Sequence, residues 1–419
     1  QCGPIAGQQP RLPAPAPVTM RVARAAKVIG MPLTQAQCAG VMRRLGLAFT
    51  EGDGTLTVAP PAYRFDLRIE EDLIEEVARI IGYPQLPETA PLAPIVPRTR
   101  SESRRSAFDV RHALADLGYL ETINFSFVDE AWERDLAGNA KPVRLLNPIA
   151  SQMNVMRSSL LGSLLDVLKH NVDRRASRLR VFEVGRVFLR DASVATTDHS
   201  VRGVNQPLRV AGLIHGPAQR QGWGGVQRPA DFYDAKGDVQ ALLAPRPARF
   251  ERAEHPALHP GRCASVAVDG QLIGHVGELH PRWRQAWGLS HAPVLFELDL
   301  QAVLQRLMPT LAALPRQLPV ERDLAVVVAE GVTHEQLQQC VRGAAVGARL
   351  LDVTLFDIYR PKPGTEAAAG MAAGEKKSMA LRLVLDDAEG QSLTDERIDA
   401  AVGVVLAALQ AQLGARLRA

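Results

Sequence analysis

Hydrophobic and polar positions over residues 18–92 predict a small module of helices and a hairpin. Residues 18–22 suit a strand, and Thr34 is placed to cap a helix that ends at a glycine. The turn-forming letters EGDG at 51–54 separate two short apolar runs, which predicts a β-hairpin. Apolar residues then recur at helical spacing over 69–81 and predict a second helix.

Residues 93–310 carry a mixed order of helix-type and strand-type patterns. Amphipathic spacing predicts helices over 103–117 and 157–170, whereas the apolar run at 179–188 predicts a strand. Because helices and strands do not alternate regularly, an α+β domain with a largely antiparallel sheet is favoured over a doubly wound parallel fold.

The last segment, 315–419, shows a simple succession of elements. They are a strand over 324–329, a helix opened by Thr333 with Gln336, strands over 350–359 and 378–385, a helix from Thr394, and an edge strand over 414–418. The order strand, helix, strand, strand, helix, strand is that of a ferredoxin-like βαββαβ domain. The chain as a whole is therefore predicted to be an α+β protein of several domains.

Composition and charge narrow the class of protein further. The 419 residues are 46% hydrophobic and 22% charged, ordinary values for globular domains, and no uncharged apolar run has the length of a membrane-spanning helix. A net charge of +4 is too small to indicate nucleic-acid binding by itself. The four cysteines lie far apart without a Cys-x-x-Cys pair, so we expect reduced thiols and a cytoplasmic protein.

Proline-rich stretches at 10–17 and 84–97 separate the patterned segments. The chain starts at Gln1 with neither an initiator methionine nor a signal peptide. We therefore expect residues 1–17 to be the remnant of an upstream domain and a linker.

Four acidic residues around the start of the second helix form a candidate metal site: Asp66, Asp72, Glu75 and Glu76. The last three stand at i, i+3 and i+4, so their carboxylates share one helix face and repel one another. A hard divalent cation such as Mg²⁺, which prefers oxygen ligands, would relieve this repulsion. A solvated helix face with an ion pair between Glu75 and Arg79 explains the same spacing, and a pair of catalytic carboxylates is a weaker alternative.

Residues 60–83 read PPAYRFDLRIEEDLIEEVARIIGY, and this segment closely resembles the metal-site segment of bacterial phenylalanyl-tRNA synthetase β subunits. By that resemblance, the acids at the four positions named above hold Mg²⁺ near the α subunit. The resemblance thus implies that residues 18–92 are a metal-binding helix and hairpin module.

The middle of the chain is similar to the same family in the motifs LLNPIA at 145–150, MRSSLL at 156–161 and VFEVGRVF at 181–188. They look like the catalytic-like domain of that subunit, which shares its antiparallel sheet fold with class II synthetases. Active class II domains grip ATP with an arginine after this last motif, but the matching position here is Leu189. The resemblance therefore implies a class II-like domain without an active site.

The last segment resembles the family's ferredoxin-fold anticodon-binding module, through RD at 322–323, LFDIYR at 355–360, KKS at 376–378 and LTD at 393–395. A local basic patch is the candidate RNA contact: Arg360, Lys362, Lys376, Lys377 and Arg382. Phe356 or Tyr359 is a possible ring for base stacking. The alternative is that the aromatic side chains are core and the cations solvated.

Together these resemblances imply the C-terminal, non-catalytic part of a phenylalanine–tRNA ligase β subunit. The family's complete enzyme is an α2β2 heterotetramer in which the α subunit uses ATP to join phenylalanine to tRNA(Phe). We expect this chain to have the α subunit and tRNA(Phe) as partners and no membrane contact. A stand-alone nucleic-acid-binding protein with a winged-helix-like module is the runner-up, and a metal-dependent hydrolase is a third possibility.

Overall fold

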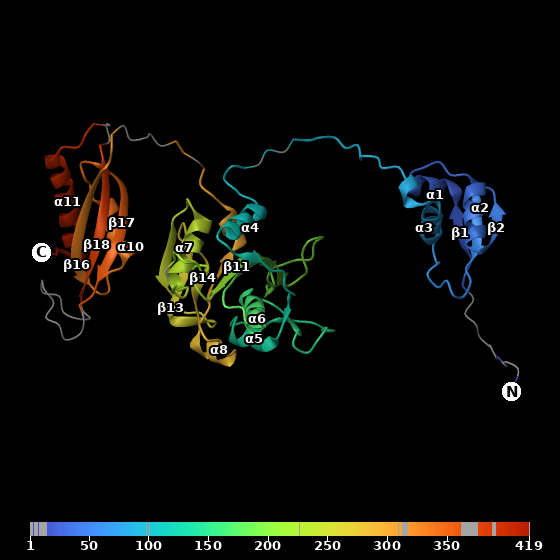
Figure 1. Ribbon diagram of the computed structural model, residues 1–419, viewed down its shortest axis with the longest axis horizontal. Helices are drawn as coiled ribbons and strands as arrows, with labels where there is room; N and C mark the ends of the chain where they lie inside the picture. The colour runs from blue at the N-terminus through green and yellow to red at the C-terminus, as the bar shows by residue number, and fades with distance from the viewer. Residues whose placement is uncertain are drawn as a thin grey trace. The chain divides into compact units, whose positions relative to one another are not determined.

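The computed structural model of the chain describes residues 3, 7, 15–97, 99, 101–225, 227–308, 310–311, 317–361, 376–387 and 391–418. By its internal contacts the chain divides into two compact units, Gln1–Thr99 and Arg100–Ala419 (Figure 1). Within the described ranges, no helix is both long and apolar enough to cross a membrane.

The first unit is built on a three-stranded antiparallel sheet with strand order β1-β3-β2. Its elements are β1 (Val18–Arg21), α1 (Val22–Ile29), α2 (Gln35–Arg44), β2 (Ala48–Gly52), β3 (Thr55–Ala59), α3 (Glu70–Ile81) and the short 3-10 helix η1 (Tyr83–Gln85). The sheet and helices share one apolar core in which Met20, Met42 and Leu73 are fully buried. The predicted hairpin is present as β2 and β3, and Thr34 caps α2 together with Gln37.

The helix α1 corrects the sequence-based prediction, which placed only a strand over 18–22. The chain turns directly from β1 into this helix, and Arg21 at the junction offers no side-chain cap, so the usual start signal is missing. The buried face of the helix is nevertheless regular, because Val22, Ala25 and Ile29 pack into the core. Gly30 ends the helix in the left-handed conformation with φ +83°.

The central part of the second unit is a seven-stranded sheet with order β12-β13-β14-β15-β11-β8-β4. Its elements are α4 (Ala107–Asp116), β4 (Leu120–Glu121), β5 (Phe127–Val128), α5 (Glu130–Asp135), β6 (Val143–Arg144), β7 (Val155–Met156), α6 (Leu161–Val172), β8 (Leu179–Arg186), β9 (Leu189–Arg190), β10 (Val204–Asn205), β11 (Leu208–His215), α7 (Phe232–Leu243), β12 (Ala248–Arg252), β13 (Leu258–Val268), β14 (Gln271–Leu279), α8 (Pro281–Ala286), β15 (Val294–Asp299) and α9 (Leu300–Leu304). All neighbouring strands of this sheet run antiparallel except β4, which pairs parallel with β8. The predicted mixed, largely antiparallel arrangement is therefore the one observed.

Helices bury both faces of the central sheet. α4, α7 and α9 form one core with Phe182 and Phe296, and α6 packs on the opposite face against Val181 and Leu295. Two smaller sheets, with orders β5-β7-β6 and β10-β9, complete this part. Since neighbouring residues of a strand point to opposite faces, the two cores take alternate side chains from the same strands.

The start of α6 also corrects a prediction, because the helix begins at Leu161 and not at Arg157. Residues 157–160 are held outside the helix by tertiary contacts. The Ser158 hydroxyl and backbone N–H bind Glu133, and the Leu160 backbone N–H donates to Glu297 at 2.6 Å. Tertiary hydrogen bonds therefore override the helical spacing in this segment.

The C-terminal part has the predicted ferredoxin-like order. Its elements are β16 (Val320–Ala329), α10 (His334–Gly343), β17 (Arg349–Tyr359), β18 (Lys376–Asp386), α11 (Asp395–Leu413) and β19 (Arg416–Leu417). The strands form an antiparallel sheet with order β17-β18-β16-β19, and the two helices pack on one of its faces around Val326, Leu381 and Val405. The predicted capping pair of Thr333 and Gln336 opens α10.

Candidate functional site

The predicted metal ligand Asp72 lies in the first turn of α3 and acts as a helix cap. Its Oδ2 atom accepts hydrogen bonds from the backbone N–H groups of Arg68 at 2.7 Å and Ile69 at 2.8 Å. These donors lie at the helix entrance, where a side-chain oxygen commonly replaces the missing intrahelical acceptor. The carboxylate of Asp72 is thus already used by its own helix.

Asp66 and Glu76 share one arginine, Arg64. This guanidinium donates to Asp66 at 2.7 Å and to Glu76 at 2.7 Å, and Arg79 contacts the other carboxylate oxygen of Glu76. The hydrogen bonds from Arg64 lower the pKa of the Asp66 carboxyl. The ion pair between Glu75 and Arg79, the alternative to a metal site, is absent among the described contacts, because Arg79 turns to Glu76 instead.

Two further acids of α3 are held by arginines from the start of the unit. Arg21 binds Glu70 through its backbone N–H at 2.8 Å and its guanidinium at 2.7 Å, and Arg24 pairs with Glu71. The hydrogen bond from Arg21 is the main cause that lowers the pKa of Glu70 to about 2. Arginines therefore offset much of the negative charge that the sequence concentrates in this helix.

Two of the four predicted ligands, Asp66 and Glu76, meet at Arg64, whereas Asp72 binds the start of its own helix. Glu75 is exposed, while the other three carboxylates are engaged as described above. Within the described part of the chain, no group of three or more His, Cys, Asp or Glu side chains is arranged to hold a metal ion. The residue types suit Mg²⁺, but their present arrangement is not a coordination shell.

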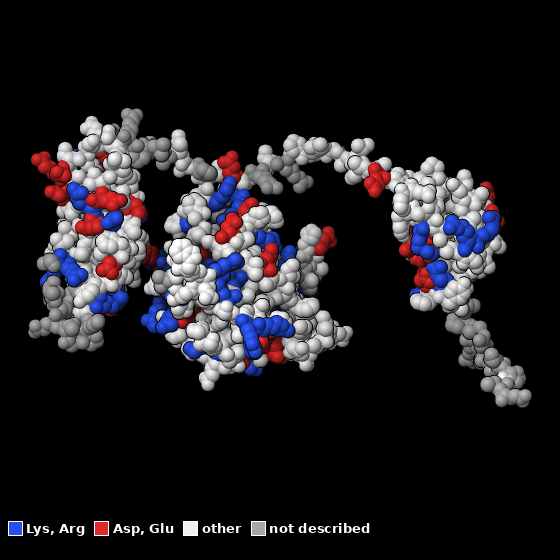
Figure 2. Space-filling view, in the orientation of Figure 1, with Lys and Arg blue, Asp and Glu red and all other residues white. Residues whose placement is uncertain are grey.

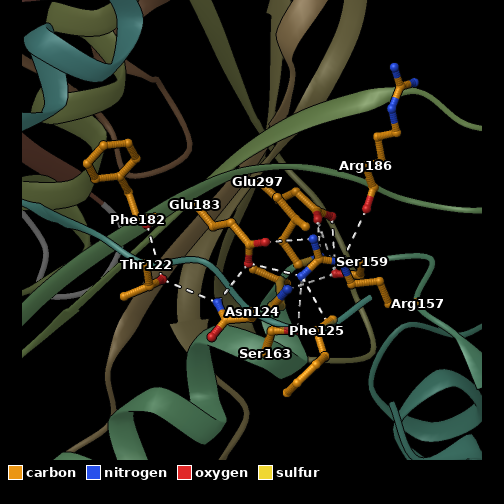
Figure 3. A network of polar contacts seen from close by, with 12 residues as sticks. Thr122, Asn124, Phe125, Arg157, Ser159, Ser163, Phe182, Glu183, Arg186 and Glu297 are labelled. Atoms are coloured by element: carbon orange, nitrogen blue, oxygen red, sulfur yellow. Dashed lines mark hydrogen bonds and ion pairs between the residues drawn. The ribbon is translucent and has the colours of Figure 1, made fainter. Parts of the chain in front are cut away.

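In the central sheet, Figure 3 shows a buried ion pair between Arg157 and Glu183. Two guanidinium nitrogens of Arg157 donate to the Glu183 carboxylate at 2.6 and 3.0 Å, and Asn124 donates to the same carboxylate at 2.8 Å. Arg157 also donates to the hydroxyl of Ser163 at 3.3 Å and to the backbone carbonyl of Arg186 at 3.2 Å. With exposures of 2% and 3%, Arg157 and Glu183 are inaccessible to a substrate and serve the fold.

A second carboxylate lies in the same row of the sheet. Glu183 and Glu297 both pair with Ala211, one from each side, so their side chains point to the same face. Arg209 donates to Glu297 at 2.8 Å, and the hydroxyl of Ser159 donates to it at 3.2 Å. Each of the two buried acids thus has its own arginine.

The packing around these ion pairs leaves no room for a side chain at Gly185. A Cβ atom there would lie 2.5 Å from a guanidinium nitrogen of Arg157 and 2.8 Å from a carboxylate oxygen of Glu183. Both are closer than real Cβ contacts, so a larger residue at this position would displace the ends of the Arg157 and Glu183 side chains from the arrangement described.

Arg190, one residue after the position matched to the class II arginine, also has a structural role. Its guanidinium donates to the backbone carbonyls of Lys141 and Pro142 at 3.1 Å. It therefore fixes the segment before β6.

The structure neutralises most of the predicted basic patch in the C-terminal part. Arg360 pairs with Glu330, and Arg382 pairs with Asp323 and with Glu321. Lys377 is buried and donates to a backbone carbonyl at 2.8 Å, and burial is the main cause that lowers its pKa; Lys376 is half-buried, and Lys362 lies outside the described residues. In Figure 2, acidic and basic side chains accordingly lie next to one another over this part of the molecule.

Sequence reasoning missed the last basic residues of the chain. Arg416 and Arg418 are exposed, and the guanidinium of Arg418 lies over the ring of Tyr359 at 4.7 Å from its centroid. Arg382 similarly lies over Phe356 at 5.6 Å. Among the described residues, neither Arg416 nor Arg418 has a carboxylate within ion-pair distance, so these charges are available to a ligand.

Comparison with known proteins gives three successive family matches. Residues 18–83 match the tRNA synthetase B5 domain, residues 86–300 the phenylalanyl tRNA synthetase beta chain CLM domain, and residues 315–418 the ferredoxin-fold anticodon binding domain. All three are named for synthetase or anticodon-binding function, which defines the chain as part of an aminoacyl-tRNA synthetase.

Relatives make the assignment more particular. The phenylalanine–tRNA ligase beta subunits of Burkholderia lata and Ralstonia nicotianae are each 49% identical to the chain, and that of Chromobacterium violaceum is 45% identical. These alignments cover 100% of this chain and 51%, 52% and 51% of the respective relatives, so the chain spans about half their length. The chain belongs to the phenylalanyl-tRNA synthetase beta chain family.

Proposed function

We propose that the chain is the C-terminal part of a non-catalytic phenylalanine–tRNA ligase β subunit that acts in the cytoplasm. It supports the ATP-dependent attachment of phenylalanine to tRNA(Phe) by assembling with the α subunit in an α2β2 heterotetramer and by contacting the tRNA. The observation that carries the proposal is the alignment of the entire chain with β subunits at 49% identity.

The modules proposed for these roles are residues 18–92, 93–310 and 315–419. The central module supplies a class II-like antiparallel sheet without the chemistry of an active site. The buried ion pairs support a non-catalytic role for this module. Arg157 is paired with Glu183, and Glu297 with Arg209, so the charges of the three buried residues are already neutralised within the protein. An adenylation site needs preorganised positive charge that remains available to the phosphates.

The test of this function compares the chain alone with the chain co-expressed with its cognate α subunit. The chain alone is expected to give no phenylalanine-dependent exchange of pyrophosphate into ATP, whereas it co-purifies with the α subunit. Exchange by the chain without α would contradict the non-catalytic assignment. Failure to associate with α would contradict the assignment as a partner subunit.

The C-terminal sheet contacts the tRNA anticodon in this proposal. Its face opposite α10 and α11 carries Tyr359 beneath Arg418, and Arg416 lies on β19, the strand at the other edge of the sheet. An aromatic ring and arginines without carboxylate partners suit an unpaired base and its phosphate. Arg360, Lys376, Lys377 and Arg382, which the sequence favoured, would have to exchange existing contacts for RNA.

Mg²⁺ binding by Asp66, Asp72, Glu75 and Glu76 stays a prediction of the family resemblance. In the arrangement described, Mg²⁺ would require Asp66 and Glu76 to leave Arg64. The test measures recovery of the α subunit with and without chelator. Loss of recovery with chelator would support the site, and equal recovery would remove its role at the interface.

Variants sharpen this test. Asp66→Asn and Glu75→Gln remove predicted ligands without touching the helix cap, and Glu71→Gln is a matched control on the same helix. A metal site is expected to make the first two variants insensitive to chelator, while the control behaves as the unchanged chain. The stand-alone nucleic-acid-binding alternative is not favoured, because a groove-facing α3 would present these acids to phosphate.

A further inference from the structure

A cavity of about 330 Å³ lies at the edge of the central sheet, away from the ion pairs described above. Its walls come from the start of β8, from the turn between α4 and β4, and from the loop after β11. The charged side chains that line it are Arg178, Arg180 and Arg220, and no carboxylate is among the lining residues. Three guanidinium groups thus line one hollow, and among the described ion pairs only Arg180 has a carboxylate partner.

Arg178 is held in place by backbone atoms. Its Nε donates to the carbonyl of Pro217 at 3.1 Å, and a terminal nitrogen donates to that of Ala218 at 3.4 Å. The loop can pass this closely because Gly216 has φ +85°, and a Cβ there would lie 2.0 Å from the carbonyl oxygen of Ser177. The guanidinium is therefore fixed in position before any ligand arrives.

No described carboxylate lies within ion-pair distance of Arg178 or Arg220. Burial lowers the pKa of the Arg178 guanidinium, and the positive charges of Arg180 and Arg220 lower it further. Each of these causes disfavours the charged form, so the unliganded cavity carries an unfavourable concentration of positive charge.

Arg180 also lines the cavity and is fixed by different contacts. It pairs with Asp238 at 3.1 Å, donates to the carbonyl of Leu117 at 3.1 Å, and lies over the ring of Tyr119. Asp238 also accepts a hydrogen bond from the Tyr119 hydroxyl at 2.7 Å. One of the three positive charges is thus balanced from within the protein, and two remain.

We propose that this cavity is a binding site for a phosphate group, held by Arg178 and Arg220 with Arg180 as the supporting wall. Guanidinium groups donate paired hydrogen bonds in a geometry that matches phosphate oxygens, and an anion would remove the repulsion between them. A purely structural role explains the bonds of Arg178 to the loop, but it leaves the exposed Arg220 beside it unexplained. The phosphate belongs either to a free anion or to an RNA backbone, and the site does not depend on the function proposed above.

The experiment measures binding to the whole purified chain at low salt by calorimetry, with inorganic pyrophosphate in one arm and tRNA in the other. Arg220→Gln removes an exposed side chain and Arg178→Gln a half-buried one. Arg174→Gln is the matched control, because Arg174 is exposed and lies outside the cavity lining. Thermal unfolding of each variant checks its folding, and Arg220→Gln alone decides the result if Arg178→Gln does not fold.

Both cavity variants are expected to weaken binding at least tenfold in one arm, with the control within twofold of the unchanged chain. Loss in the pyrophosphate arm identifies a free anion, and loss in the tRNA arm alone identifies the RNA backbone. The proposal is overturned if neither probe binds, if the cavity variants bind as the unchanged chain does, or if the control loses as much affinity as they do.

Discussion

Individual buried charges in the central sheet depend on a single partner of opposite sign. Glu183 has Arg157 and Asn124, and Glu297 has Arg209. Removing one member of such a pair leaves a charge in a poorly solvated place, whereas removing both does not. Comparing the single variant with the double variant therefore separates the cost of an unpaired buried charge from the contribution of the ion pair itself.

We expect Arg157→Met to lower the free energy of unfolding by about 3 kcal/mol, because the Glu183 carboxylate loses its charged partner. The double variant Arg157→Met/Glu183→Met should recover much of this loss. Urea unfolding followed by tryptophan fluorescence measures it cleanly, since Trp132, Trp223, Trp283 and Trp287 are all the tryptophans and all lie in the central part. A double variant that is less stable than the single one would contradict this account.

We expect the stability of the central part to depend on pH through His255. Its ring lies 5.2 Å from that of His275, and burial, followed by the charge of His275 and of Arg209, lowers the pKa of His255 from 6.5 to about 4. The unfolded chain therefore takes up a proton between these values while the folded chain does not. Stability present above pH 6.5 is lost as the pH falls toward 4, by about 3 kcal/mol in all.

Tryptophan-detected urea unfolding at pH 7.5 and pH 4.5 tests this expectation. His255→Gln removes the titrating group, so the variant should lose less stability between the two pH values than the unchanged chain. An equal loss in both proteins would show that other groups carry the acid sensitivity.

At the scale of elements, α3 shows how one helix distributes a dense set of acids. Asp72 binds backbone N–H groups at the helix start, where negative charge is favoured by the helix dipole. Glu75, one turn later, is exposed, and its side chain makes no hydrogen bond among those described. The two acids are equivalent in the sequence pattern but not in the structure.

We expect Asp72→Ala to destabilise the first unit by about 1 kcal/mol, the usual cost of a lost cap, irrespective of added Mg²⁺ or chelator. Glu75→Ala should change stability by less than half of that. Hydrogen exchange of the backbone over 70–81 measures the effect on this helix directly. Equal effects of the two substitutions would contradict the capping role.

The start of α6 shows that tertiary contacts can move the boundary of a helix. Residues 157–160 lie in the predicted helix over 157–170, yet they stay outside α6, because Arg157, Ser158 and Leu160 bind Glu183, Glu133 and Glu297 through side chains or backbone N–H groups. Those acids come from other elements, so a local pattern contains no information about them.

At the scale of the whole molecule, the C-terminal sheet brings together residues from distant strands. Arg418 follows β19 at one edge of the sheet and Tyr359 ends β17 at the other edge, and the guanidinium of Arg418 crosses the face between them to lie over the Tyr359 ring. This arrangement is a consequence of the ferredoxin-like strand order. The sequence indicated the order of elements correctly, but it favoured Arg360 and Arg382, which the sheet pairs with acids.

We expect Tyr359→Leu to weaken tRNA binding about tenfold, because base stacking on an aromatic ring contributes roughly 1–3 kcal/mol. Arg418→Gln should also weaken it, because the guanidinium available to a phosphate is lost. Tyr359→Phe should bind nearly as well as the unchanged chain, since the ring is kept. Filter binding of tRNA at fixed ionic strength measures these affinities. Arg342→Gln on α10 is the charge control, and a loss as large as that of Arg418→Gln would indicate a general charge effect.

The amino-acid sequence by itself determined the elements whose signals are local: the hairpin in the first unit, the caps at Thr34 and Thr333, and the order of the C-terminal domain. Such signals depend on residues within a few positions of one another. Only the tertiary structure decided which charges are available, because Arg21 and Glu70 are 49 residues apart and Arg157 and Glu183 are 26 apart. Their pairing follows from strand register and helix packing, which no periodicity encodes.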